Sequence, residues 1–158
     1  MIGRRFRHPG SRAFRTDPRG QAQVEFVLTI LFVTVLLLGI IELIMLIYTY
    51  NVLADSAKEG VRYAVVHGCD LTNCSGTCSP ACPDPAADNV KAWVLNFAQA
   101  SLHDTSTMTV AVNYLDTGGT ATPPSRVQVT VSYPYQPFFG FSWPSVTVQA
   151  AAEGRIVY

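Results

Sequence analysis

The chain has 158 residues, which is enough for one domain and too few for a large multidomain enzyme. Hydrophobic residues make up 49% of it and charged residues only 14%, so apolar side chains must be concentrated somewhere. The formal net charge of zero hides a division, because residues 1–20 contain six arginines and one acid, whereas five basic and ten acidic residues follow. A basic arm can bind nucleic acid, but no basic face or recognition motif follows it, so we expect no nucleic-acid partner.

An apolar run extends from Val24 to Tyr48 and is interrupted by only two charges, Glu25 and Glu42. About 20 apolar residues span a bilayer, whereas a secretory signal has an apolar region of about 7–15 residues, so this run predicts a transmembrane anchor. Arginines crowd its N-terminal side. The positive-inside rule therefore predicts that residues 1–20 are cytoplasmic and that everything from about Asn51 onward is extracytoplasmic.

The helical pattern continues beyond the apolar run. Apolar residues recur there at spacings of three and four, as on one face of a helix: Leu53, Ala57, Val61 and Ala64. Gly68 is a stop signal after this pattern. We therefore expect one helix from Ala22 to His67, whose outer part forms a stem beyond the membrane.

The junction between the basic arm and the apolar run reads RGQAQVEFVLTI, in which Gly20 is followed by Glu25 and Phe26. This pattern resembles a prepilin-type processing site. Two further segments occur in the order that TadE-like proteins show, LLLGIIEL at residues 36–43 and NVLADSAKEGVRYAVV at residues 51–66. The sequence thus resembles TadE-like proteins, which are minor pilins of the Flp-type tight-adherence system, closely over about 47 residues.

The resemblance implies that a membrane-embedded prepilin peptidase cuts after Gly20 on the cytoplasmic side and makes Gln21 the new N-terminus. It implies a pilin-like fold and a single-pass protein of the bacterial inner membrane that can also reach a pilus or the cell surface. The implied partners are the peptidase, other pilins or pseudopilins, and the Tad-type secretion machinery.

The two acids of the apolar run each allow two interpretations. An unpaired carboxylate in hydrocarbon costs several kcal/mol, and in assembled pilins the amine of a neighbouring subunit is expected to meet Glu25. Alternatively, the helix dipole stabilises Glu25 by about 0.3–1 kcal/mol at headgroup level. Because Gly20 and Phe26 accompany it, we favour the assembly role. Glu42 lies deeper in the run, and either snorkels to the outer interface or faces another helix.

Four cysteines lie between Gly68 and Asp88: Cys69, Cys74, Cys78 and Cys82. Outside the cytoplasm an even number of cysteines predicts two disulfides, and three pairings remain open. The alternative is a zinc or iron-sulfur site, but the spacing lacks C-x-x-C pairs and no histidine completes a familiar pattern. We expect no metal and no other cofactor. This loop departs from the family pattern.

The residues after the loop predict a small α+β domain. Asp88 can cap a helix to about Leu102, with an apolar stripe of Val90, Val94, Phe97 and Ser101 or Leu102. Period-two alternation predicts three antiparallel strands, at Thr107–Leu115, Arg126–Tyr133 and Ser145–Ala152.

An aromatic segment, PYQPFFGFSWP, connects the last two expected strands. Its rings either complete a small core, lie on the stem helix, or form an interaction surface for subunit packing or for the outer leaflet. The residues concerned are Tyr135, Phe138, Phe139, Phe141 and Trp143.

The expected fold class is α+β, with a long N-terminal transmembrane and stem helix followed by a small extracytoplasmic domain that contains one helix and an antiparallel sheet. The expected segments are a basic leader (1–20), a transmembrane helix (21–50), its extracytoplasmic continuation (51–68), a cysteine-rich loop (69–88) and the small α+β domain (89–158).

An enzymatic role is not expected, because the candidates His67, His103 and Asp104 do not belong to a catalytic motif and no phosphate-cradling loop occurs. We expect a minor pilin or pseudopilin that takes part in pilus assembly or in its secretion machinery. The alternative is a permanently anchored module that binds an extracytoplasmic ligand or surface. Cleavage after Gly20 distinguishes the two, since a mere anchor has no need of a new N-terminus.

Overall fold

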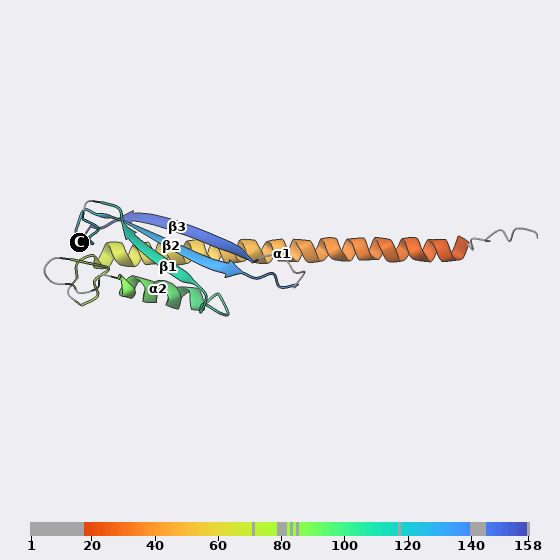
Figure 1. Ribbon diagram of the computed structural model, residues 1–158, viewed down its shortest axis with the longest axis horizontal. Helices are drawn as coiled ribbons and strands as arrows, with labels where there is room; N and C mark the ends of the chain where they lie inside the picture. The colour runs from red at the N-terminus through yellow and green to blue at the C-terminus, as the bar shows by residue number, and fades with distance from the viewer. Residues whose placement is uncertain are drawn as a thin grey trace, which may run out of the picture. The chain divides into compact units, whose positions relative to one another are not determined.

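The computed structural model describes residues 18–157, except residues 71, 79–81, 83, 85, 117 and 140–144. The basic arm before Pro18 and the aromatic residues Phe141 and Trp143 therefore lie outside the described residues. In chain order the elements are α1 (Pro18–His67), α2 (Asp88–Gln99), β1 (Thr109–Tyr114), β2 (Arg126–Tyr135) and β3 (Val146–Arg155), as labelled in Figure 1. This order confirms the expected α+β class with a long N-terminal helix.

The chain divides into two units, residues 1–39 and residues 40–158, and each is described by itself. In the first unit the described residues form the beginning of α1, and their large apolar side chains are exposed on every side of the helix. The hydroxyls of Thr29 and Thr34 donate to the carbonyls one turn earlier, at 2.8 and 2.7 Å. Hydroxyls satisfied in this way suit a helix that has no water around it.

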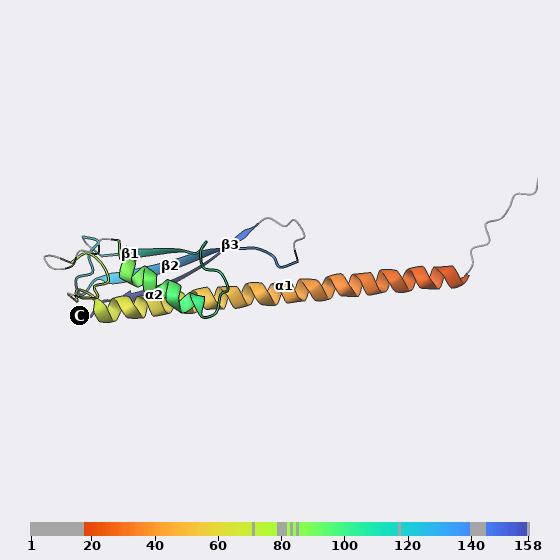
Figure 2. The ribbon, with the colours of Figure 1, turned by 90° about the horizontal axis from the view of Figure 1, so that it is seen from below.

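The second unit, residues 40–158, contains the C-terminal part of α1 (residues 40–67), then α2 and the sheet. The strand order is β1-β2-β3, and each neighbouring pair is antiparallel. Figures 1 and 2 show α2 and the sheet lying along the outer part of α1. The stripe expected on the stem is buried here and consists of Leu53, Ala57, Val61 and Ala64. It packs in one core with the inward-facing valines of β2, which are Val127, Val129 and Val131. The opposite positions of β2 are less buried, as in an antiparallel sheet with one face in water.

At Gly60, α1 lies close to both α2 and β2. A Cβ atom at this position would overlap Cγ2 of Val94 on α2 and would lie 3.2 Å from Cγ1 of Val129 on β2. Gly154 on β3 has the same role, because a Cβ there would overlap Cγ1 of Val61. Glycine at these two positions lets the backbone of α1 lie directly on its neighbours.

The start of α2 differs from the expectation, because Asp88 does not cap the helix. Instead, the carboxylate of Asp84 accepts the backbone N–H of Asp88 at 2.9 Å and that of Asn89 at 3.2 Å. Asp88 is the first helical residue, and its side chain pairs with Lys91 at 3.1 Å. The acid that satisfies the free N–H groups thus lies four residues before the expected one.

The sequence also predicted the buried face and the last residue of α2 partly wrongly. The helix ends at Gln99 and not at Leu102, and its buried residues are Val90, Val94 and Ala98. Phe97 is 40% exposed. A stripe of every fourth residue turns the small Ala98 inward, and Phe97 then lies about 100° away around the helix.

The strand ends follow from the pairing of β2 with β3. Arg126 lies opposite Arg155 and Tyr135 lies opposite Val146, so both strands are longer than their alternating segments. β1 is shorter than expected, because its six residues pair only with the segment of β2 from Val127 to Ser132. Strand pairing and not side-chain alternation sets these limits.

Candidate functional site along α1

The expected processing motif lies at the beginning of α1. Gly20 and Gln21 are in the first turns of the helix, both are exposed, and a Cβ at Gly20 would meet nothing within 4 Å. A helix end has unsatisfied N–H groups and frays readily. The bond between Gly20 and Gln21 is therefore in a position that an enzyme can reach.

Glu25 lies one helical turn after Gln21, on the same side of the helix. It is exposed, and so are its large apolar neighbours Val24, Phe26 and Leu28. An acid on such a surface needs a partner when hydrocarbon surrounds the helix. The geometry offers the carboxylate and the apolar surface around it to another molecule.

Glu42 is hydrogen-bonded by residues of its own unit that lie far from it in the sequence. One carboxylate oxygen accepts the phenol O–H of Tyr135 at 2.5 Å, and the two oxygens accept the backbone N–H of Phe138 at 3.2 and 3.1 Å. Burial, and then the hydrogen bond and the charge of Glu42, raise the pKa of Tyr135 to about 12. The phenol therefore keeps its proton and remains a donor at neutral pH.

This arrangement of Glu42 was absent from both sequence interpretations. The carboxylate is neither simply solvated nor aimed only at another helix, because Tyr135 and Phe138 supply three hydrogen bonds from a segment more than ninety residues later. Contact of Glu42 with a neighbouring helix stays a prediction. An acid late in an apolar run and a distant uncharged aromatic segment were the available signals, but nothing local links them.

The four cysteines form two disulfides, Cys69 with Cys78 and Cys74 with Cys82. Their sulfurs are consequently not free thiolates in this structure. Within the described residues, no three His, Cys, Asp or Glu side chains are grouped so as to hold a metal ion.

Hydrogen bonds from α2 and β1 help to attach the cysteine loop to the rest of the second unit. The amide of Asn89 on α2 donates to the carbonyl of Cys74 at 3.0 Å, and the phenol of Tyr114 on β1 donates to the carbonyl of Ser75. Burial raises the pKa of Tyr114. The loop is thus fixed at the end of the stem, next to His67.

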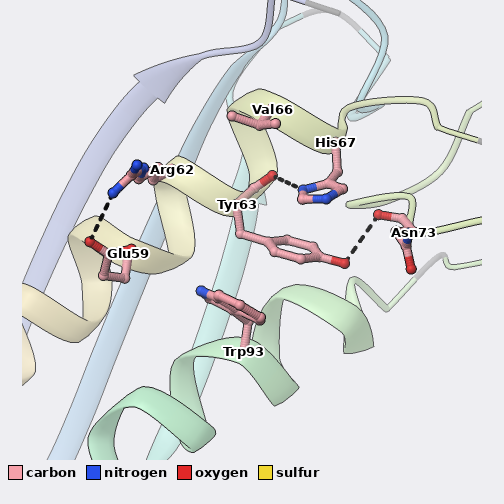
Figure 3. Close-up of a pocket in the computed structure, with 7 residues that line it drawn as sticks. All are labelled: Glu59, Arg62, Tyr63, Val66, His67, Asn73 and Trp93. Atoms are coloured by element: carbon pink, nitrogen blue, oxygen red, sulfur yellow. Dashed lines mark hydrogen bonds and ion pairs between the residues drawn. The ribbon is translucent and has the colours of Figure 1, made fainter.

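An open pocket of about 720 Å³ lies beside this loop, and Figure 3 shows its lining. The ring of Tyr63 stacks on His67 at 4.1 Å between centroids and on Trp93 of α2 at 5.4 Å. Tyr63 also donates to the carbonyl of Asn73, and burial raises the pKa of its phenol. The remaining lining residues are Glu59, Arg62 and Val66. Of these residues, His67 was considered from the sequence as a candidate site residue, and nothing in the sequence indicated that it would meet Tyr63 and Trp93.

Asp104 has a structural partner. Its carboxylate accepts the backbone N–H of Ser106 at 2.8 Å, and this hydrogen bond lowers the pKa of Asp104. His103 and Asp104 follow the end of α2 and are both outside the lining of the pocket around His67. The described residues therefore show no convergent set of groups that would suit an enzyme.

The fold and the site define a class of protein: a small α+β domain carried on a helix that is long and apolar enough to cross a membrane. Within that class, residues 20–62 match the family model described as TadE-like protein. The match confirms the resemblance over this segment, which contains Gly20, Glu25 and Glu42. No curated protein and no solved structure shows significant similarity to the chain.

Proposed function

We propose that this chain is a minor pilin or pseudopilin that takes part in the assembly of a Flp/Tad-type pilus or of its secretion machinery. The observation that carries the proposal is the match of residues 20–62 to TadE-like proteins, a pilus-associated structural family. The helix anchors the chain in the inner membrane, with residues 1–20 in the cytoplasm and residues 51–158 outside. The excess of arginine before Gln21 supports this orientation.

A prepilin peptidase removes the leader by cutting after Gly20. The exposed position of Gly20 in the first turns of α1 supports this step. Cleavage leaves an α-amino group on Gln21, which has an unperturbed pKa of about 8 and is cationic at neutral pH. The new charge appears one turn from Glu25.

The new amine and Glu25 pair between subunits. Four residues separate Gln21 from Glu25, which corresponds to about 6 Å along the helix axis at a rise of about 1.5 Å per residue. Two parallel copies of α1 that are shifted by about this distance bring the amine of one copy to the carboxylate of the other. The pair compensates both charges, and the exposed apolar side chains around Glu25 pack between the helices.

The first experiment is N-terminal sequencing of the membrane-extracted protein, produced with and without a matching prepilin peptidase. We expect a peptidase-dependent start at Gln21. The control is Gly20→Val, whose branched side chain at the scissile bond should leave the leader in place. An intact start at Met1 in the presence of active peptidase would sink the processed-pilin proposal.

The second experiment tests Glu25 after processing is established. Glu25→Ala should still be cleaved but should not enter an assembly with other pilins, measured by cross-linking in membranes. Gln23→Ala, a nearby exposed change without loss of charge, is the matched control. Equal assembly by both variants would remove the pairing role of Glu25 and leave the cleavage result standing.

A permanently anchored binding module is the second candidate. The open pocket around Tyr63, His67 and Trp93 favours it, because stacked aromatic rings beside an ion pair of Glu59 and Arg62 can hold a ligand. This candidate requires no cleavage after Gly20, so the sequencing experiment separates it from the first.

A further inference from the structure

The segment that follows β2 is held at a defined position on α1. We call residues 135–139 the aromatic turn. Tyr135 is the last residue of β2, and its phenol donates to Glu42 at 2.5 Å. The backbone N–H of Phe138 donates to the same carboxylate at 3.1–3.2 Å. The aromatic turn therefore lies against the turn of α1 that contains Glu42.

The position of Glu42 in the sequence places the aromatic turn relative to a bilayer. Glu42 follows Val24, the start of the apolar run, by 18 residues. At a rise of about 1.5 Å per residue this separation is about 27 Å, and the hydrocarbon layer is about 30 Å thick. When Val24 is at the inner edge of the hydrocarbon, Glu42 and the groups bound to it are at the outer edge.

The aromatic turn presents apolar surface at this level. Phe138 is 78% exposed, and its ring meets Phe139 edge to face, with the centroids 5.2 Å apart. The sequence has no charged residue from Tyr133 to Val146. On α1, the neighbours of Glu42 are apolar and exposed as well, among them Ile41 and Leu43. An exposed aromatic segment whose own residues are uncharged fits the interface between a membrane and water, where tryptophan and tyrosine are enriched.

We propose that the aromatic turn inserts into the outer leaflet of the membrane that α1 spans, with Phe138 in contact with phospholipid. Glu42 is the positioning residue, because it binds the turn through its side-chain and main-chain donors and so fixes its depth. Lipid is favoured over a second copy of the chain because the adjacent residues of α1, Ile41 and Leu43, are apolar and exposed and lie at the depth that the spacing from Val24 assigns to the outer edge of the hydrocarbon. This inference depends on α1 as a membrane anchor, but it does not depend on cleavage after Gly20.

The test uses the full chain reconstituted into vesicles of phosphatidylethanolamine and phosphatidylglycerol, with flotation of the vesicles as the check that the chain is anchored. A photoreactive benzophenone side chain replaces Phe138, and in a separate variant it replaces Trp93, a 49% exposed aromatic residue on α2. After illumination, mass spectrometry identifies what is attached to each position. We expect phospholipid adducts at position 138 and none at position 93.

A second set of variants tests Glu42 with the benzophenone kept at position 138. Glu42→Leu removes both acceptors while keeping the helix apolar, and we expect loss of the lipid adducts. Glu42→Gln keeps an acceptor oxygen, so we expect most of the adducts to remain. If floating, anchored protein shows cross-links to a second copy at position 138, or no more lipid adducts there than at position 93, the proposal is wrong. Lipid adducts that persist in Glu42→Leu would overturn the positioning role of Glu42.

Discussion

The two parts of α1 contain the same types of apolar residue but place them in opposite environments. Up to Gly39, leucine, valine and isoleucine occupy every side of the helix, and all are exposed except Leu38, which is partly buried. From Leu53 to Ala64, apolar residues return every three or four positions and are buried against the sheet and α2. The difference teaches that the pattern of apolar residues, and not their number, decides whether a helix needs lipid or its own domain.

Side-chain size separates the two parts further. The buried stripe of the stem contains Ala57, Gly60 and Ala64, which allow the sheet and α2 to approach the helix closely. The part of α1 up to Gly39 contains a run of bulky residues, Leu36–Leu38, and a Cβ at Gly39 would meet nothing within 4 Å. Substitutions at equivalent residue types in the two parts should consequently have different effects.

The largest difference is expected for leucine truncation. Leu53 is fully buried, so Leu53→Ala should lower the free energy of unfolding of the second unit by about 2–5 kcal/mol. Leu36→Ala is the matched control, because Leu36 is 48% exposed, and it should change this free energy by less than about 0.5 kcal/mol. The measurement is urea unfolding of the detergent-solubilised chain, followed by tryptophan fluorescence. Equal effects would remove the contrast between the two parts.

A smaller difference is expected for glycine. Gly60→Ala places a methyl group on Val94 and Val129, and overpacking of this kind costs about 1–3 kcal/mol. In Gly39→Ala the new methyl group meets no neighbour, so the higher helix propensity of alanine should leave stability unchanged or slightly higher. Urea midpoints of the two variants provide the comparison. A stable Gly60→Ala protein would show that α1 is not packed closely on α2 and β2.

Within the second unit, the two acids at the start of α2 are expected to contribute differently to stability. Asp84→Ala removes the acceptor for two backbone N–H groups and should cost about 1 kcal/mol of the free energy of unfolding. Asp88→Ala removes only an exposed pair with Lys91, which is worth less, about 0–1 kcal/mol. The reverse order of the two effects in urea unfolding would restore Asp88 as the cap.

A pH-dependent effect is expected from alkaline titration of Tyr135. Burial, and then the hydrogen bond to Glu42 and its charge, raise the pKa of Tyr135 to about 12 from the ordinary value of 10, so the protonated phenol contributes its full share of stability below about pH 10. This contribution is lost as the pH rises through about 12, because the phenolate can no longer donate and repels the carboxylate. Tyr135→Phe should lack this part of the pH dependence. Parallel stability curves for the two proteins between these pH values would contradict the bond.

Many features of the fold could be predicted from local sequence pattern alone. The long apolar run predicted a helix able to cross a membrane, the three-and-four spacing predicted the stripe from Leu53 to Ala64, and alternation predicted three strands. The motif around Gly20 and Glu25 identified the family segment, and four cysteines in a segment expected to be extracytoplasmic predicted two disulfides. These features could be read because each depends on residues within one or two turns of a helix or along one strand.

Only the tertiary structure decided which distant groups meet. Three contacts depend on how the cysteine loop returns to α2. They are the disulfide between Cys69 and Cys78, the cap of α2 by Asp84, and the stacking of Tyr63 on Trp93. The bond of Glu42 to Tyr135 and Phe138 depends on the path of the sheet back along α1. Local periodicity contains no information on such contacts, because strand pairing and the close packing of α1 at Gly60 decide them together.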